Sequence, residues 1–392
     1  MVEVQAAPAW RTCPSLGSMR SRQISRVCRE FAPFLALLLV SWWLAAPAHA
    51  APGQWSSASR LQSGREFHPA TTLPDGKVLV SGGFSFAGGI QGTAELFDPA
   101  QRRWVSTFPM AHARFAHTST LLPNGHVLVA GGANLEDGYV APAEQLDPAS
   151  ATWQTAGRML RARANHTASL LQDGRVLVAG GLARHHTELR TAEIYDPATN
   201  AWSRAASMQD VRYHHTATTL LDGRVLVTGG DRADESFVRT AEIYDPATNR
   251  WKRVPSMRFV RGNHTATLLR SGRVLVAGGG APNPGYVRGA ELFDPRTNRW
   301  SLVRPMRAER GFHVAALLPT GQVLVAGGFA DGQTVRGAEL FTPATRRWRA
   351  TGPLRKARGH ASIAVTGNSV LVAGGALVTG RIVPSAELYS PG

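Results

Sequence analysis

Short blocks of hydrophobic and polar residues alternate along this chain in a pattern typical of β-strands. In residues 163–202, the runs HTASLL (166–171) and RVLVAGG (175–181) are predicted strands, and Asp173-Gly174 between them is a strong hairpin signal. The run AEIY (192–195) predicts a third strand, DPATN (196–200) predicts a turn, and Trp202 opens a fourth strand. One block therefore predicts a small antiparallel sheet of four strands.

This block recurs at intervals of 48 or 49 residues through the rest of the chain. The tryptophans that mark it are Trp55, Trp104, Trp153, Trp202, Trp251, Trp300 and Trp348. A Gly-Gly pair follows the second strand of each block, from Gly82-Gly83 to Gly374-Gly375. A fixed period of this length is the signature of a radial or stacked repeat. The pattern predicts an all-β, seven-bladed β-propeller over residues 51–392.

The two ends of the repeat region indicate how the ring closes. The chain ends at residues 387–392, after a third strand and its turn, while residues 55–61 form an unclaimed Trp-bearing fourth strand. We expect this N-terminal strand to complete the seventh blade, so that no edge is left unpaired. A stacked linear solenoid is the alternative, but it would leave two half-repeats unexplained.

The recurring block contains four elements in order: R-x-x-H, V-L-V-x-G-G, A-E-hydrophobic-Tyr/Phe-D-P and Trp. This motif resembles the kelch repeat across the whole of residues 51–392. The resemblance is to kelch β-propellers of a secreted bacterial type, similar to the central domain of galactose oxidase. It implies a propeller fold, and kelch domains most often work as binding modules rather than as enzymes.

Residues 1–50 do not repeat and are predicted to be a secretory signal peptide. Arginines at 20, 22, 26 and 29 precede the apolar run FAPFLALLLVSWWLAA (31–46), and Ala48-His49-Ala50 is a small-residue cleavage site. We expect cleavage after Ala50 and a secreted or periplasmic protein with no further membrane attachment. An uncleaved membrane anchor is the alternative, and translation could begin at Met1 or at Met19.

Composition narrows the chemistry of the chain. Both cysteines, Cys13 and Cys28, lie in the predicted leader, so a mature chain would have neither a disulfide nor a cysteine metal site. The net charge of +16 falls to +13 when the five arginines and two acids of residues 1–50 are removed. This charge permits an anionic partner, but no basic run with interleaved aromatic residues predicts specific nucleic-acid binding. No cofactor or metal is predicted, and the protein is expected to be a monomer.

Three charged or polar series recur in step with the blades and are interpreted as structural. We expect each arginine to pair with a glutamate, and each histidine to form a local hydrogen bond at the start of an inner strand rather than to bind metal. The arginines are Arg65, Arg114, Arg163, Arg212, Arg261, Arg310 and Arg358; the glutamates are Glu95, Glu144, Glu193, Glu242, Glu291, Glu339 and Glu387; the histidines are His68, His117, His166, His215, His264, His313 and, one position early, His360. The alternative for the arginines is an exposed ring that binds anions.

The ligand site is predicted on the face that carries the loops after the Gly-Gly pairs. The opposite face has only short, monotonous turns, and binding residues concentrate on variable loops of a rigid scaffold. The candidate binding residues on these loops are Phe84, Phe86, Asp137, Tyr139, His185, His186, Asp231, Asp234, Glu235 and Tyr286. Aromatic rings beside carboxylates suit a carbohydrate, which would use a pocket, or a protein partner, which would use a broad rim.

The leading prediction is a secreted, non-catalytic binding module for a glycan or a protein, with no catalytic residue assigned. The alternative is a carbohydrate-active enzyme of the sugar mutarotase or epimerase type, which needs only an acid–base pair such as Glu188 with His185 or His186. The resemblance to galactose oxidase implies a copper site with a Tyr–Cys cross-link. Copper-radical oxidase activity is disfavoured because the mature chain would contain no cysteine.

Overall fold

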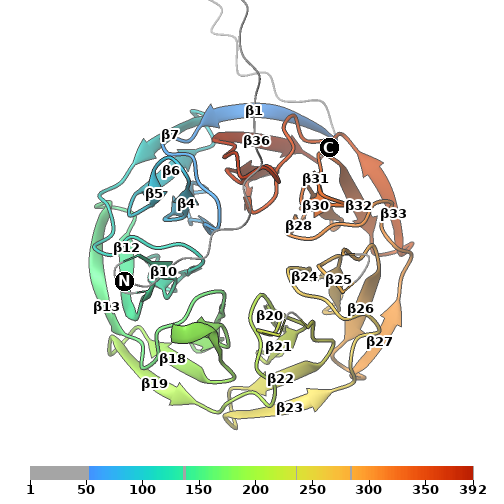
Figure 1. The fold of residues 1–392 in the computed structure, drawn as a ribbon, viewed down its shortest axis with the longest axis horizontal. Coiled ribbons are helices and arrows are strands. Elements are labelled where there is room, and N and C mark those ends of the chain that lie inside the picture. Colours follow the sequence, from blue (N-terminus) through green and yellow to red (C-terminus); the bar gives the residue numbers. More distant parts are fainter. Residues whose placement is uncertain (1–52, 136–137, 235, 283–284, 392) are drawn as a thin grey trace, which may run out of the picture. The chain divides into compact units, whose positions relative to one another are not determined.

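The computed structural model of the protein describes residues 53–391, apart from 136–137, 235 and 283–284. These residues form seven four-stranded antiparallel sheets arranged as blades around a common axis (Figure 1). The hollow along this axis, lined by residues such as His68, His117 and His166, is called the channel. The predicted all-β, seven-bladed propeller is therefore confirmed. The predicted leader lies outside the described residues. Within the described ranges, no helix has the length and apolarity needed to cross a membrane.

Each blade runs from an inner strand at the channel to an outer strand at the rim, and the blades are numbered in the chain order of their inner strands. Blade 1 contains β2 (Ala70–Thr72), β3 (Val78–Ser81), β6 (Ala94–Asp98) and β7 (Arg103–Ser106). Blade 2 contains β8 (Thr118–Leu121), β9 (Val127–Ala130), β12 (Pro142–Asp147) and β13 (Thr152–Arg158). Blade 3 contains β14 (Thr167–Leu170), β15 (Val176–Ala179), β18 (Ala192–Asp196) and β19 (Ala201–Ala205). Blade 4 contains β20 (Thr216–Thr219), β21 (Val225–Thr228), β22 (Ala241–Asp245) and β23 (Arg250–Val254). Blade 5 contains β24 (Thr265–Leu268), β25 (Val274–Ala277), β26 (Ala290–Asp294) and β27 (Arg299–Leu302). Blade 6 contains β28 (Val314–Leu317), β29 (Val323–Ala326), β32 (Ala338–Thr342) and β33 (Arg347–Thr351). Blade 7 contains β34 (Ser362–Thr366), β35 (Ser369–Ala373), β36 (Ser385–Ser390) and β1 (Gln54–Arg60).

Four of the loops after the Gly-Gly pairs form small hairpins above the blades. They are β4 (Phe84–Ser85) with β5 (Gly89–Ile90), β10 (Ala133–Asn134) with β11 (Gly138–Tyr139), β16 (Leu182–Ala183) with β17 (Thr187–Glu188), and β30 (Phe329–Ala330) with β31 (Gln333–Thr334). A short 3-10 turn, η1 (Arg184–His186), joins β16 to β17.

The hydrophobic core lies between neighbouring blades rather than inside any one of them. Successive side chains of a strand point to opposite faces, so Val225 and Val227 pack against Leu177 of blade 3, while Leu226 packs against Val274 of blade 5. Both faces of the V-L-V strand are buried, which explains its uninterrupted apolar sequence.

The arginine and glutamate series form a buried ion pair in every blade, as expected. In blade 3, Arg163 Nη2 lies 2.6 Å from Glu193 Oε1, and Arg163 Nη1 donates to the carbonyls of Gly180 and Thr191, each at 2.9 Å. Glu193 also accepts hydrogen bonds from the backbone N–H of Leu160 (2.6 Å) and its neighbour in the link from blade 2. The seven Arg–Glu distances span 2.6–3.0 Å. Each pair therefore joins the second and third strands to the link that enters the blade.

Ring closure follows the prediction from the orphan tryptophan. Strand β1 pairs antiparallel with β36, in a register that sets Trp55 opposite Tyr389 (Figure 1). The indole N–H of Trp55 also donates to the carbonyl of Gly352 in blade 6, at 2.8 Å. Five other tryptophans make the same bond to a carbonyl in or just after the preceding outer strand, for example Trp202 to Ala156 at 2.8 Å, whereas Nε1 of Trp348 has no hydrogen-bond partner within the described residues. Six of the tryptophans thus tie successive blades together at the rim.

Candidate ligand site at the channel mouth

A ring of seven residues with left-handed backbone surrounds the channel, one from each blade. Their φ angles lie between 50° and 54° although none is glycine: Phe67, Ala116, Asn165, His214, Asn263, Phe312 and His360. From Ala116 to His360, the backbone N–H of each donates to the carbonyl of the equivalent residue in the preceding blade, at 2.9–3.2 Å. We call this set the mouth ring.

The conformation of the mouth ring is costly for residues that carry a side chain. A non-glycine residue in this region costs on the order of 1 kcal/mol or more, and such residues persist where the surrounding structure fixes them. Inter-blade backbone bonds fix the residues of the mouth ring in this way. Backbone strain of this kind is concentrated at functional sites, so the mouth ring is a candidate site.

The recurrent histidines lie just beyond the mouth ring and are structural, as expected. In six blades the Nε2 atom bonds to a hydroxyl of the preceding blade at 2.9–3.1 Å, as in His166 with Thr118 (3.1 Å). Burial, followed by a nearby arginine, lowers the pKa of His68, His166 and His313 to about 3. These imidazoles are neutral at physiological pH and hold the inner strands together.

The side chains of the mouth ring divide it into two arcs. Asn165, His214 and Asn263 in blades 3–5 form a polar arc, and Phe312, His360 and Phe67 in blades 6, 7 and 1 form an aromatic arc. In blade 2, Ala116 separates the two. The mouth is therefore amphipathic, although its backbone is nearly seven-fold symmetric.

The polar arc is organised by one carboxylate. Asp231 Oδ2 lies 2.8 Å from His214 Nδ1 and accepts a hydrogen bond from Asn263 Nδ2 at 3.0 Å. A neutral His214 that donates from Nδ1 has Nε2 as an acceptor. The His214 side chain keeps 24% of its surface exposed, and its Nε2 has no hydrogen bond in the described part of the chain. The imidazole is thus oriented by Asp231 and is accessible to a ligand.

The aromatic arc contains a second histidine–carboxylate pair. His360 Nδ1 lies 2.8 Å from Glu66 Oε2, and Glu66 is buried. The imidazole of His360 lies 3.9 Å from the ring of Phe67 and 4.6 Å from that of Phe312, with Phe329 at 5.0 Å. These rings form an aromatic cluster around His360, of which Phe67 and His360 line the central recess.

The mouth is hollowed where the arcs meet. A recess of about 280 Å³ is lined by residues of blades 1–4 and 7, among them Phe67, Asn165, His214 and His360. A volume of this order admits one or two small rings rather than a large ligand.

Of the predicted loop residues, Asp231 lies at the mouth itself. Phe84 lies beside the mouth, because a β-bridge joins it to Glu66, the residue before Phe67 of the mouth ring. The residues after the other Gly-Gly pairs form the same bridge in their own blades. The ring of Phe84 packs 5.1 Å from Phe86, which is 73% exposed, and 6.0 Å from Phe115. Tyr286 covers the backbone of blade 6 so closely that a Cβ on Gly311 would lie 2.7 Å from its ring.

The other predicted residues are spread away from the mouth. Tyr139 and His185 line a separate groove of about 550 Å³ between blades 2 and 3. His186 and Asp234 are exposed, and Asp234 accepts hydrogen bonds from Ser236 in its own loop. Asp137 and Glu235 lie outside the described residues.

The acid–base pair considered from the sequence is not assembled by these loops. The carboxylate of Glu188 accepts a hydrogen bond from the backbone N–H of Ala233 in the next blade. Within the described residues it has no hydrogen bond to His185 or His186. Glu188 therefore anchors a loop rather than activating an imidazole.

None of the seven mouth-ring residues is among the binding residues predicted from the sequence. His214, Asn263, Phe312 and Glu66 occupy the middle positions of R-x-x-H, a motif whose regularity indicates scaffold. A usable signal is nevertheless present, because in six blades these two positions vary between a constant arginine and a constant histidine; in blade 7, Ala361 replaces that histidine.

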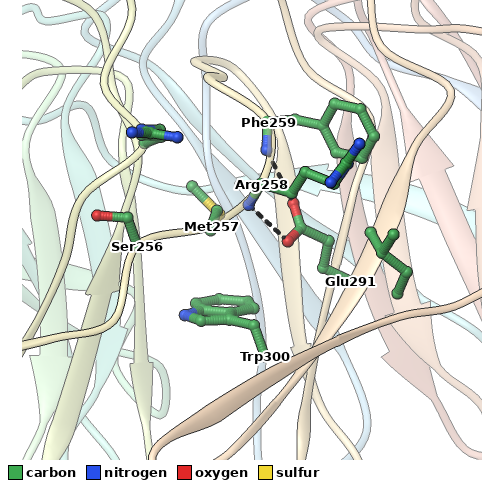
Figure 2. A pocket seen from close by; sticks show the side chains of 8 residues that line it. Ser256, Met257, Arg258, Phe259, Glu291 and Trp300 are labelled. Carbon is green, nitrogen blue, oxygen red and sulfur yellow. Dashed lines mark hydrogen bonds between the residues drawn. The ribbon is translucent and has the colours of Figure 1, made fainter.

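A third recess, of about 660 Å³, lies between blades 4 and 5 (Figure 2). Its carboxylate, Glu291, accepts hydrogen bonds from the backbone N–H of Arg258 at 2.8 Å and of Phe259 at 3.3 Å. These are the bonds that Glu193 makes in blade 3. The carboxylate in this groove is thus part of the scaffold.

The described residues do not fit a copper-radical site. They include no cysteine, and no three of their His, Asp or Glu residues are grouped as metal ligands would be.

Comparisons with known proteins agree with the architecture. Residues 67–279 match the sequence model described as the KLHDC2/KLHL20/DRC7 Kelch-repeats domain, and residues 263–307 match the Kelch motif. No curated protein sequence matches the chain. Among solved structures, it resembles a novel fungal alcohol oxidase of the AA5 family, in complex with copper, with a TM-score of 0.71 and 20% identity over 87% of this chain and 77% of that one. At this identity the likeness shows the fold alone.

Proposed function

Because the chain belongs to the kelch-repeat family, we propose that it is a ligand-binding propeller whose site is the mouth ring with its supporting residues Glu66 and Asp231. The observation that carries this proposal is the break in repetition. Hydrogen bonds and packing repeat from blade to blade elsewhere, but the seven side chains at the mouth differ and are sorted into a polar and an aromatic arc.

The chemistry of the two arcs favours a sugar as the ligand. A pyranose has an apolar face that stacks on aromatic rings and hydroxyl groups that exchange hydrogen bonds with amides, imidazoles and carboxylates. Phe67 and His360 supply the ring faces, while His214 and Asn165 supply the polar groups, and all four line the recess. The recess of about 280 Å³ suits one or two sugar units.

A glycan array probed with residues 51–392 tests this proposal, followed by titration of the best ligand. Replacing His214 or Asn165 with Ala removes one hydrogen bond to the ligand, and we expect binding to weaken about ten-fold, which corresponds to about 1.4 kcal/mol. Asp234→Ala, on an exposed loop, is the control and should leave affinity unchanged. If no glycan binds, or if Asp234→Ala weakens binding as much as His214→Ala, the site is not the mouth ring.

A mutarotase or epimerase activity is the second candidate, and the His214–Asp231 pair is the observation that favours it. An imidazole oriented by a carboxylate can relay protons between the anomeric hydroxyl and the ring oxygen of a sugar. The test is the rate of anomer interconversion measured by NMR. His214→Gln keeps a polar side chain but should abolish catalysis; if any observed rate survives this change, His214 is not the acid–base group.

A further inference from the structure

Exposed arginines recur at two equivalent positions on the rim of blades 4–7. The first position precedes the third strand of a blade, and its carbonyl accepts the N–H of the Met or Leu in the following link. The second position is the next residue of that link, whose N–H donates to the scaffold glutamate. Three successive grooves contain arginine at both positions: Arg239 with Arg258, Arg288 with Arg307, and Arg336 with Arg355. We call these the arginine pairs.

The arginine pairs occupy only one side of the ring. The equivalent positions in the grooves between blades 7 and 1, 1 and 2, and 2 and 3 contain no arginine; they are Pro384 and Gln62, Gly92 and Ala111, and Ala141 and Leu160. The groove between blades 3 and 4 has a single arginine, Arg190, opposite Gln209. The pairs are therefore a local feature and not a requirement of the repeat.

Within the described residues, the charges of these six arginines are not neutralised by ion pairs, although Arg336 Nε donates a hydrogen bond to the carbonyl of Leu354 at 2.9 Å. All six are exposed, and within the described residues none has a carboxylate within ion-pair distance. Arginines of the lower turns differ, since Arg175 and Arg224 are each paired with the aspartate of their own turn at 2.6–2.7 Å. Part of the excess positive charge of the chain therefore lies on this rim, although exposed Arg158, Arg161 and Arg184 also line the groove between blades 2 and 3.

The groove between blades 4 and 5 shows what each pair encloses. Arg239 and Arg258 line its recess of about 660 Å³ together with the indole of Trp300 (Figure 2). The carboxylate of Glu291 in this groove is already neutralised by Arg261 at 3.0 Å. An incoming anion therefore meets two uncompensated guanidinium groups beside an aromatic ring.

The middle groove also has acidic side chains nearby. Burial and the neighbouring Asp331 raise the pKa of Glu309, and Arg288 opposes that rise.

We propose that the three arginine pairs form a track for a linear acidic polysaccharide that bears carboxylate or sulfate groups. A guanidinium forks onto both kinds of oxyanion, and a sugar ring can lie against an indole beside it. Pairs that recur from blade to blade match a polymer whose charges recur along its length. This track is separate from the mouth ring and does not depend on what binds there.

Single-stranded nucleic acid, the other common linear polyanion, fits this rim less well. Its binding sites combine positive charge with exposed aromatic side chains on which bases stack. In the described part of the chain, the strongly exposed aromatic side chains are Phe86 and Phe108, and both belong to blade 1.

The test measures binding of residues 51–392 to polygalacturonate and to heparin by calorimetry at about 0.15 M salt, with neutral dextran for comparison. The rim variant combines Arg239→Ser, Arg288→Ser and Arg336→Ser. The control variant removes the same charge from exposed outer-strand positions, with Arg204→Ser, Arg250→Ser and Arg299→Ser.

We expect at least one of the two acidic polymers to bind, dextran not to bind, and the rim variant to weaken binding at least ten-fold while the control variant weakens it less than two-fold. Unchanged melting temperatures would show that both variants are folded. The proposal is overturned if neither acidic polymer binds, if both variants lose affinity equally, or if a single-stranded oligonucleotide binds more tightly than either polysaccharide. A mouth-ring variant, His214→Ala, should retain the polysaccharide affinity, which separates this result from the test of the proposed function.

Discussion

Replacing Glu193 with Gln tests whether the buried ion pairs hold the blades in register. Glu193 is 2% exposed, and its two oxygens accept hydrogen bonds from Arg163, from the N–H of Leu160 and from the N–H of Arg161. Glutamine has the same shape but offers one acceptor oxygen and one NH2 group, which must face a donor. The change therefore removes the negative charge beside a fully buried guanidinium and places two donors against each other.

The expected magnitude follows from the partners that Arg163 keeps. Removing one member of a buried pair costs about 3–5 kcal/mol, and the remaining bonds of Arg163 to the carbonyls of Gly180 and Thr191 place the loss near the lower end, at about 3 kcal/mol. Urea unfolding followed by tryptophan fluorescence measures this loss directly. Asp173→Asn, in an exposed pair with Arg175, is the control and should cost less than about 1 kcal/mol. If the two variants are equally stable, the buried pairs do not hold the blades.

Four further predictions address the histidines, the glycines and the two ends of the chain. The folded-state pKa of His166 is about 3, below the unfolded value, so its contribution to stability is complete above about pH 6.5. This contribution is lost as the pH falls towards 3, at up to about 1.4 kcal/mol per pH unit. The melting temperature measured at pH 7.5, 6 and 5 should decrease progressively, and a flat profile would contradict the prediction. Gly180→Ala places a Cβ 2.6 Å from the ring of His215 and should cost several kcal/mol in chemical unfolding, whereas Gly332→Ala, with similar φ and open space, should cost about 1 kcal/mol; equal losses would show that only φ matters. Deleting residues 51–61 removes β1 and should lower the melting temperature of the whole ring, and an unchanged melting temperature would disprove closure by β1. Intact-mass measurement of exported protein should give a chain that begins after Ala50, and a mass that includes residues 31–50 would instead indicate a membrane anchor.

The fold was predictable because its determinants recur. Seven copies of each strand, turn and Gly-Gly pair average out the ambiguity of any single short strand, and the orphan Trp55 identified the strand that closes the ring. The Arg–Glu pairing could be predicted for the same reason, since equal numbers at equal spacing leave few other partners.

The candidate site was only partly predictable because it depends on geometry that the repeat pattern hides. The sequence directs attention to long variable loops, and Asp231 could be identified in this way. His214 and His360 lie outside those loops, and their importance comes from a left-handed backbone and from carboxylates that the fold brings beside them. Neither the φ angle of a non-glycine residue nor a contact between Glu66 and a residue 294 positions later can be read from spacing.

The backbone hydrogen bonds of the mouth ring make it a natural platform for protein engineering. Six main-chain N–H to carbonyl bonds hold the ring, and within the described residues the side chains of Ala116 and Asn165 form no hydrogen bond, so they contribute little to these bonds. A combinatorial library that varies positions such as Ala116 and Asn165 should therefore yield folded members at high frequency. Because the bonds that hold the ring are separate from these side chains, substitutions at such positions could change a ligand preference without producing variants that fail to fold.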